Sequence, residues 1–167
     1  MTSALEQLRH GIVDLLPRLR RFGRLLTRHR EDADDLVQLA LERALQRADQ
    51  WQPGTRLDSW LFRIMQNAWI DELRARGRHD QLFAPEEEGE HVGVSPTEAQ
   101  IDALALRKAM AGLSEDHRTV VALVLVEGFS YAEAAEVLGV PMGTLTSRLA
   151  RARDALQAAL GGKGAPA

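Results

Sequence analysis

The polar groups with the most distinctive spacing lie near the end of the chain. This segment combines three hydroxyl side chains with two arginines: Thr144, Thr146, Ser147, Arg148 and Arg151. Short hydroxyl side chains allow close approach to phosphates and base edges, and an arginine can grip guanine or phosphate through two parallel hydrogen bonds. The segment therefore carries the donors that nucleic-acid binding requires.

Arginines also gather in two earlier groups. The first comprises Arg18, Arg20, Arg21, Arg24, Arg28 and Arg30, and the second comprises Arg74, Arg76 and Arg78. Either group could bind phosphates or simply form the solvated face of a helix. The net charge of −3 hides this basic character. Six acids and no Lys or Arg lie between His79 and Gln100, so the rest of the chain carries a net positive charge.

Residues that could catalyse a reaction or hold a metal are few. Glu31, Asp32, Asp34 and Asp35 form an acidic cluster, but carboxylates are common at helix starts and no second set of ligands accompanies them. The five histidines lack ligand spacing, cysteine is absent, and no phosphate-binding glycine loop occurs. We therefore predict a protein that is not an enzyme and has no metal or cofactor.

The composition indicates a folded protein of the cytoplasm. The hydrophobic fraction of 45% and the charged fraction of 27% are ordinary for a soluble globular chain. Glu6 and Arg9 stand where a signal peptide needs an apolar core, and no apolar run approaches the roughly 20 residues of a membrane span. The absence of cysteine agrees with a reducing compartment. We expect no membrane insertion.

Apolar residues recur at helical spacing almost throughout, so the sequence predicts an all-α fold. We expect helices from Leu15 to just before Glu31, from there to about Ala48, and from about Asp58 to Arg76. The second of these should bury one face and leave Leu36 and Leu39 partly or wholly outside it. The members of that face are Val37, Leu41, Ala44, Leu45 and Ala48.

The pattern divides the chain into two small helical domains. Residues 1–78 form the first, and residues 79–100 form an acidic, flexible linker with prolines, glycines and no periodicity. Helical spacing resumes at Glu98, residues 101–160 form the second domain, and residues 161–167 form a flexible tail.

The second domain carries consecutive helix start and stop signals. Ser114 should cap one helix that Gly128 ends, and Ser130 with Glu133 forms a capping box for a short helix that ends at Gly139. A longer helix follows and runs to Leu156. The predicted apolar contacts between the last two helices come from Ala134, Leu138, Val140, Leu145 and Leu149. This is the helix-turn-helix arrangement, with an ordinary helical hairpin of basic exterior as the alternative.

These residues resemble a known family. The segment from Gly128 to Arg153 is closely similar to the promoter-reading C-terminal domain of extracytoplasmic-function sigma factors. Independently, the first domain resembles the family's N-terminal domain, in the same order and at the usual separation. The matching parts are Asp32 to Gln38, Arg43 with Ala44, Trp60 to Ile64, and Asn67. Together the two similarities cover nearly everything from Leu15 to Leu160.

The resemblance implies a role for each part. Asp35, Leu36, Val37 and Gln38 would bind core RNA polymerase at the clamp helices of its β′ subunit, with the β subunit as a further contact. The helix from Ser59 to Arg76 and the preceding loop would melt and read the minus-10 element of promoter DNA. Asn67 would lie near a pocket for an extruded base, and Arg74, Arg76 and Arg78 would hold phosphates. The last helix would read the minus-35 element through Thr144, Thr146, Ser147, Arg148 and Arg151.

The family also implies an anti-sigma partner that covers both domains. The opening of the chain is weakly similar to general-stress members, so we expect a role in stress response. Leu39, Leu41 and Thr146 depart from the family's usual residues, which affects the polymerase and duplex contacts. Trp60 and Trp69 could stack on bases or belong to the core. Two other functions stay open: a conventional helix-turn-helix regulator, and a sigma mimic that sequesters an anti-sigma protein.

Overall fold

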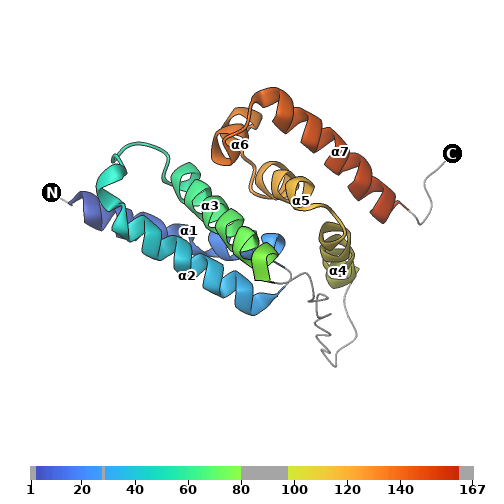
Figure 1. Ribbon diagram of the computed structural model, residues 1–167, viewed down its shortest axis with the longest axis horizontal. Helices are drawn as coiled ribbons and strands as arrows, with labels where there is room; N and C mark the ends of the chain where they lie inside the picture. Colours follow the sequence, from blue (N-terminus) through green and yellow to red (C-terminus); the bar gives the residue numbers. More distant parts are fainter. Residues whose placement is uncertain (1–2, 28, 80–97, 162–167) are drawn as a thin grey trace.

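The computed structural model describes residues 3–27, 29–79 and 98–161. Within these ranges the chain is helical and contains no strand, so the all-α prediction is confirmed. The helices are α1 (Ala4–Leu26), α2 (Arg30–Gln46), a 3-10 turn η1 (Ala48–Gln50), α3 (Leu57–His79), α4 (Glu98–Ala111), α5 (Glu115–Val121), a π-helical turn η2 (Ala122–Val126), α6 (Tyr131–Leu138) and α7 (Met142–Leu160). Figure 1 shows α1 to α3 as one group and α4 to α7 as another.

Helix α1 begins earlier than the apolar pattern predicted. Ser3 and Glu6 form a reciprocal capping box, in which the Ser3 backbone N–H donates to the Glu6 carboxylate at 2.9 Å and the Glu6 backbone N–H donates to the Ser3 hydroxyl at 3.2 Å. The cap allows a helix of 23 residues that passes through Pro17, whose ring removes one backbone donor. Its buried face includes Leu8, Leu19 and other residues of the core.

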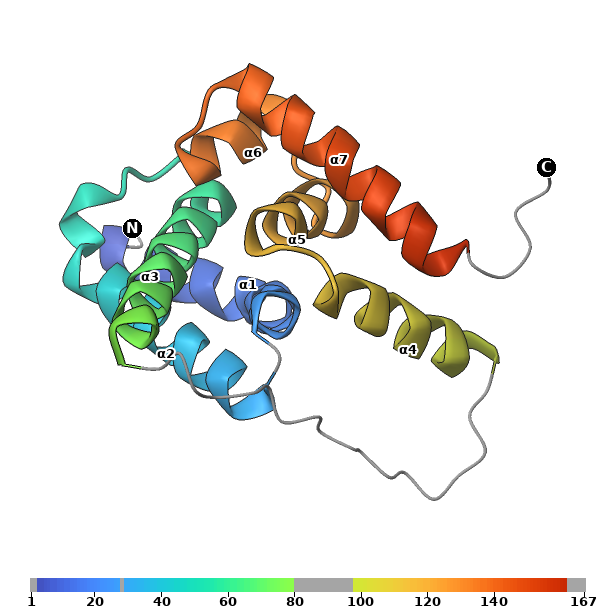
Figure 2. The same cartoon turned by 45° about the vertical axis from the view of Figure 1, so that its right-hand side comes forward.

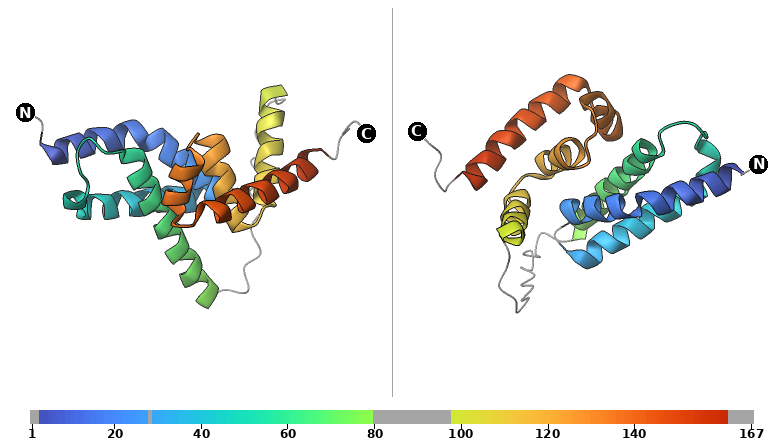
Figure 3. Two further views of the ribbon diagram at one scale, coloured as in Figure 1. Left: turned by 90° about the horizontal axis from the view of Figure 1, so that it is seen from above. Right: turned by 180° about the vertical axis from the view of Figure 1, so that it is seen from behind.

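Helix α2 corrects the predicted apolar face. Leu36 is buried with 4% of its surface exposed, whereas Leu45 is 45% exposed. The helix packs against both α1 and α3, and α1 lies alongside it in the view from behind (Figure 3). Its buried stripe consists of Ala33, Leu36, Val37, Ala40 and Ala44. Three of these are alanines, which let two neighbouring helices approach. The predicted face shares Val37 and Ala44 with this stripe but is rotated toward Leu45.

Helix α3 places most of its apolar side chains in the core. Leu61, Phe62, Met65 and Trp69 are all at most 4% exposed, so Trp69 is a core residue, while Trp60 is half-buried. The N-terminal part of α3 packs against α6 of the other group (Figure 2). Helix α3 extends through His79 and α4 begins at Glu98, so both ends of the predicted linker are helical. Its remainder, residues 80–97, and residues 162–167 of the predicted tail lie outside the described residues.

The caps predicted for the second group are confirmed. Ser114 caps α5 by accepting a hydrogen bond from the backbone N–H of His117, and Ser130 and Glu133 form the capping box of α6. Gly128 and Gly139 have φ of 75° and 66°, the left-handed conformation that ends a helix and that glycine adopts without strain. The π turn η2 was not predicted, and it continues α5 directly.

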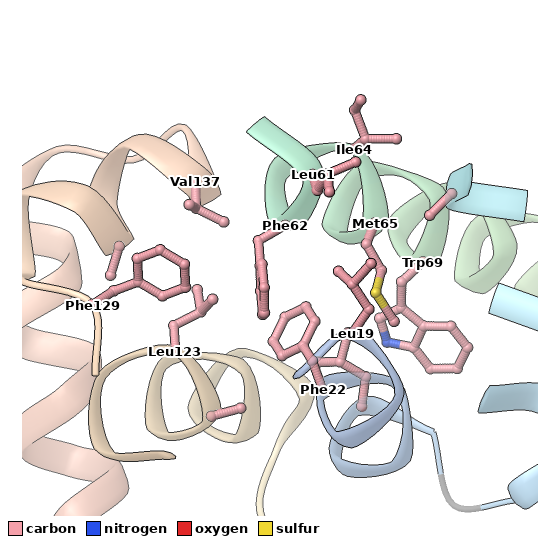
Figure 4. Close-up of a cluster of buried hydrophobic side chains, with 14 of the residues drawn as sticks. Leu19, Phe22, Leu61, Phe62, Ile64, Met65, Trp69, Leu123, Phe129 and Val137 are labelled. Carbon is pink, nitrogen blue, oxygen red and sulfur yellow. The ribbon is translucent and has the colours of Figure 1, made fainter. Parts of the chain in front are cut away.

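The two groups of helices share one hydrophobic core. Figure 4 shows Phe62 of α3 between Phe22 of α1 and Phe129, which follows η2. Arg118 of α5, only 2% exposed, adds a polar tie, because its guanidinium donates to the carbonyl oxygen of Leu26 at 3.2 Å. Across the described ranges, no helix combines the length and apolarity that a membrane crossing needs.

Candidate nucleic-acid interface

Helices α6 and α7 form the predicted helix-turn-helix. The left-handed Gly139 ends α6, and Pro141 at the N-cap opens α7. Ala134 and Leu145 are fully buried between the helices and Leu149 is 2% exposed, as the apolar pattern predicted. The remaining predicted contacts, Leu138 and Val140, are partly buried against the same core. This packing fixes which side of α7 faces outward.

The outward side of α7 carries the polar residues that the sequence singled out. Thr146, Ser147 and Arg151 are exposed, and Thr144 and Arg148 are half-exposed. The Thr146 hydroxyl donates to the carbonyl oxygen of Gly143 at 3.1 Å. The Arg148 guanidinium lies 3.8 Å from the Asp116 carboxylate, a loose ion pair that a phosphate or a guanine edge could replace at little cost. The face thus offers hydroxyl and guanidinium donors along one helix.

The candidate residues of α3 differ in their surroundings. Asn67 and Arg74 are exposed. Arg76 pairs with Asp32 and Glu72 at 3.1 Å each and lies over the ring of Trp69, 5.7 Å from its centroid. Burial lowers the pKa of Arg76, but the hydrogen bonds and charges of the two acids outweigh it and raise the pKa. Arg78 belongs to α3, but its side chain lies outside the described residues.

The four candidate residues of α2 separate into an exposed pair and a buried pair. Asp35 and Gln38 are exposed, whereas Leu36 and Val37 are 4% and 6% exposed and belong to the core. Beside this pair is a shallow hollow of about 160 Å³ between α2 and α3, lined by Asp32, Asp35, Leu36, Leu39, Trp69, Glu72 and Arg76. Leu39, expected to be exposed, is half-buried in its wall. Of the four residues, Asp35 and Gln38 are therefore the accessible ones.

A cluster of charged residues between the two helical groups was not predicted. Glu127 accepts from the Nε of Arg18 at 3.0 Å and from the Nε and Nη2 of Arg21 at 2.8 Å each, and the Glu127 side chain is fully buried. The hydrogen bonds to Glu127 raise the pKa of Arg21 despite the opposing effect of burial. Nothing in the local sequence around Glu127 points to partners more than 100 residues away.

Asp58 and Arg56 extend the same cluster along the start of α3. Arg56 donates to both oxygens of Asp58, at 3.1 and 2.6 Å, and pairs with Glu133 of α6. Burial alone would raise the pKa of Asp58, but hydrogen bonds from Arg56, the Ser59 backbone N–H and Arg18 outweigh it, so the pKa lies below its usual value. The carboxylate is therefore ionised near neutral pH.

No cluster of potential metal ligands accompanies these surfaces in the part of the chain that the structure covers. No three His, Asp or Glu side chains gather there as metal ligands would. The acidic residues Glu31, Asp32, Asp34 and Asp35 stand in the first two turns of α2, where carboxylates favour helix formation. A helix-turn-helix beside a second helical bundle that carries arginines defines a two-domain, helical DNA-binding protein.

Comparison with known proteins specifies the class further. Residues 12–66 match the family described as the sigma2 domain of PhyR, and residues 103–156 match sigma-70 region 4. The chain is 36% identical over 159 residues to the ECF RNA polymerase sigma factor EcfG of Rhodopseudomonas palustris (strain TIE-1), covering 93% of this chain and 86% of the relative. It is 39% identical over 144 residues to the ECF sigma factor SigM of Mycobacterium tuberculosis, covering 86% of this chain and 71% of that one.

A solved structure agrees over both helical groups. The sigma factor RpoE from Bartonella quintana, in complex with the anti-sigma factor NepR, is 32% identical and superposes with a TM-score of 0.81 over 95% of this chain and 99% of that chain. The protein belongs to the extracytoplasmic-function sigma factors. It directs promoter-specific transcription initiation by RNA polymerase and, like the family, is not an enzyme.

Proposed function

We propose that the two helical groups divide the work of initiation. Residues 1–78 would bind core RNA polymerase and read the minus-10 element, and residues 101–160 would read the minus-35 element, with residues 79–100 connecting them. The observation that carries this proposal is the outward polar face of α7, on a helix-turn-helix whose partner bundle presents a separate set of arginines and amides.

Core polymerase would bind at α2. Asp35 and Gln38 offer an exposed carboxylate and amide, and the hollow beside them provides an apolar wall through Leu39. The clamp helices of the β′ subunit are the proposed contact, and the β subunit adds another. Leu36 and Val37 support this surface from the core and hold α2 in place, so their contribution is indirect.

Helix α3 and residues 51–56 before it would melt and read the minus-10 element. Asn67 has an amide that can donate to and accept from an unpaired base, and Arg74 and Arg76 can bind the phosphates on either side. Arg78 is assigned to the same role from its place in the sequence. Arg76 would exchange Asp32 or Glu72 for a phosphate, because all three are anionic partners of similar geometry.

Helix α7 would read the minus-35 element from the major groove. A recognition helix reads bases with three or four side chains of its outward face. Helix α7 offers five candidates for these contacts: Thr144, Thr146, Ser147, Arg148 and Arg151. Arginine recognises guanine through two acceptors, so Arg148 and Arg151 are the residues expected to discriminate between bases.

An anti-sigma factor is the proposed regulator, and the cytoplasm is the proposed location, because core polymerase and promoter DNA are found there. Support for the regulator comes from the relative crystallised with NepR, whose fold extends over 95% of this chain. An anti-sigma factor that contacts both helical groups would block polymerase and promoter together.

Run-off transcription with purified core polymerase on a library of genomic promoter fragments tests the proposed division. The D35A/Q38A variant should lose binding to core polymerase while keeping its helical content, because both side chains are exposed. E42A, an exposed carboxylate on the same helix, is the matched control and should bind normally. Unchanged association of D35A/Q38A with core polymerase would show that α2 is not the docking helix.

A further inference from the structure

The contact between the two helical groups is built around a buried carboxylate. The side chain of Glu127, immediately after η2, is fully buried and is held by Arg18 and Arg21 of α1 through three short hydrogen bonds of 2.8 to 3.0 Å. Charge-assisted bonds of this length are among the strongest that side chains make, and a buried carboxylate without its partners would be costly. Glu127 therefore specifies contact between the groups.

A row of three aromatic rings, which we call the aromatic ladder, also joins the two helical groups. Phe22 and Phe62 have ring centroids 4.9 Å apart, and Phe62 and Phe129 meet edge to face at 5.1 Å, so the ladder crosses from the first group into the second. The Arg18 guanidinium lies 5.2 Å and 5.5 Å from the centroids of Phe62 and Phe129. Figure 4 shows the three rings side by side, and the guanidinium packs against two of them.

A second charged contact covers the start of α3. Arg56 stands in the loop before α3 and pairs with Glu133 of α6, while Asp58 in the first turn of α3 binds both Arg56 and Arg18. This loop and the start of α3 belong to the segment assigned above to the minus-10 element. In this arrangement, acids of the second domain occupy basic groups that a DNA phosphate would otherwise bind.

These contacts form what we call the interdomain latch. It consists of Arg18, Arg21, Arg56, Asp58, Glu127 and Glu133. Three cations face three anions, so the latch is neutral as a whole. Reversal of one charge leaves an excess of two charges of one sign inside it.

The closed arrangement is too small for both promoter elements at once. Elements centred near positions −35 and −10 are separated by about 25 base pairs, or roughly 85 Å of duplex at about 3.4 Å per pair. A compact chain of this length is roughly 40 Å across. Residues 80–97 provide 18 residues, and a chain of that length can extend to about 60 Å, so the covalent connection permits the domains to separate.

We propose that the interdomain latch holds this sigma factor in a closed, self-inhibited state, in which Glu127 and Glu133 of the second domain take the place of promoter phosphates on the first. This inference rests on the proposed promoter roles of α3 and α7. Promoter binding requires that the latch open, so the apparent affinity for DNA is the intrinsic affinity multiplied by the fraction of open molecules. For an open fraction of about 10%, full opening strengthens binding about tenfold.

Distance measurement between the domains tests the closed state without polymerase or promoter. The sequence contains no cysteine, so dyes can be attached to the full-length E42C/Q157C variant, whose positions are exposed on α2 and α7. Energy transfer should fall when E127R is added, because a fourth arginine would then lie in the latch, directly beside Arg18 and Arg21. R21E, at a side chain that is 50% exposed, should lower it as well, and R21E/E127R should restore it because the latch is neutral again.

DNA binding tests whether closure inhibits. The probe is a labelled, mixed-sequence duplex with a single-stranded branch, titrated at low salt. E127R should bind it about tenfold more tightly than wild type. E136R makes the same change of charge at an exposed position of α6 outside the latch, so it shows how much of any gain is simple attraction. Circular dichroism of each variant verifies that the helices are retained, and the exposed R21E site keeps the test valid if E127R misfolds.

The two measurements can each overturn the proposal. Equal energy transfer in wild type, E127R and R21E would show that the latch does not hold the domains together. Equal gains in DNA affinity for E127R and E136R would show that closure does not inhibit. Because neither readout involves polymerase, a negative result leaves the transcription experiment to judge the proposed function separately.

Discussion

Replacement of Arg118 by methionine would remove the most heavily hydrogen-bonded side chain of the described core. Its guanidinium donates to four carbonyl oxygens: Met110 at 3.0 Å, Leu26 at 3.2 Å, Ala111 at 3.3 Å and Leu113 at 2.8 Å. Three of these carbonyls lie at the end of α4 or just after it, where helix carbonyls lack partners within the helix. Arg118 thus caps one helix and fastens α1 to it.

The expected loss of stability follows from those four bonds. A buried acceptor deprived of its donor costs about 1 kcal/mol or more. The Met110 carbonyl keeps a hydrogen bond from the Leu113 backbone N–H at 3.1 Å, so the other three carbonyls amount to about 3 kcal/mol. Methionine fills the volume of the arginine stem and removes the cost of burying a charge, which offsets part of this. We therefore expect R118M to lower the free energy of unfolding by about 2 kcal/mol, a large share of the roughly 5–15 kcal/mol typical of a folded domain.

Urea denaturation followed by two signals provides the assay. All three tryptophans, Trp51, Trp60 and Trp69, belong to the first helical group, so their fluorescence reports that group, while far-ultraviolet circular dichroism reports every helix. Loss of helix should precede the change in fluorescence, because α4 and α5 lose more partners than α1. R107M, an exposed arginine of α4, is the control. A loss below about 1 kcal/mol in R118M would refute the assignment of these bonds as net stabilising.

Three further predictions concern the recognition domain and the latch. R148A should reduce minus-35 discrimination by about 1–3 kcal/mol in competition binding and leave affinity for core polymerase unchanged; equal loss of both would contradict the role given to α7. G139A should destabilise the protein by about 1 kcal/mol in thermal denaturation, because the φ of 66° is strained for alanine. No atom lies near an added Cβ at either Gly139 or Gly143, so the backbone strain is the only cost, and the helical control G143A should not destabilise. The pKa of Asp58 is lower in the folded protein than its ordinary value of 3.8. The stability that its ionised carboxylate contributes is therefore fully present above pH 3.8 and is lost as the pH falls through the folded-state pKa. Wild type should therefore exceed D58N in unfolding free energy at neutral pH, and a difference that does not narrow below pH 3.8 would exclude this linkage.

Local signals explain why the second domain could be predicted closely from sequence. Each cap depends on residues at most three positions apart, such as Ser130 with Glu133, and each stop depends on a single glycine, such as Gly139. The start of α1 obeys the same rule. The capping box of Ser3 and Glu6 is a local signal of this kind, whereas the apolar spacing that predicted the helix begins only at Leu15.

Features set by packing could not be predicted in this way. The buried stripe of α2 depends on α1 and α3 lying on two sides of it, which favours Ala33 and Ala40 over Leu45. The latch joins Arg18 and Arg21 to Glu127 across 109 and 106 positions of sequence, and a single glutamate beside a glycine has no local mark of such partners. Among the site residues, exposure separates Asp35 and Gln38 from Leu36 and Val37, although all four are adjacent.

The wide turn η2 has a consequence for how this protein can vary. Its backbone bonds reach one residue further than those of an α-helix, as when the Glu127 N–H donates to the carbonyl oxygen of Ala122 at 2.9 Å. One extra residue is thereby accommodated, and everything downstream is turned by roughly 100° relative to a regular helix. Deletion of a single residue between Ala122 and Val126 would rewind the segment and swing Glu127 and Phe129 away from their partners. Relatives that differ in length at this one point would thus differ in how their halves meet, even with every contact residue retained.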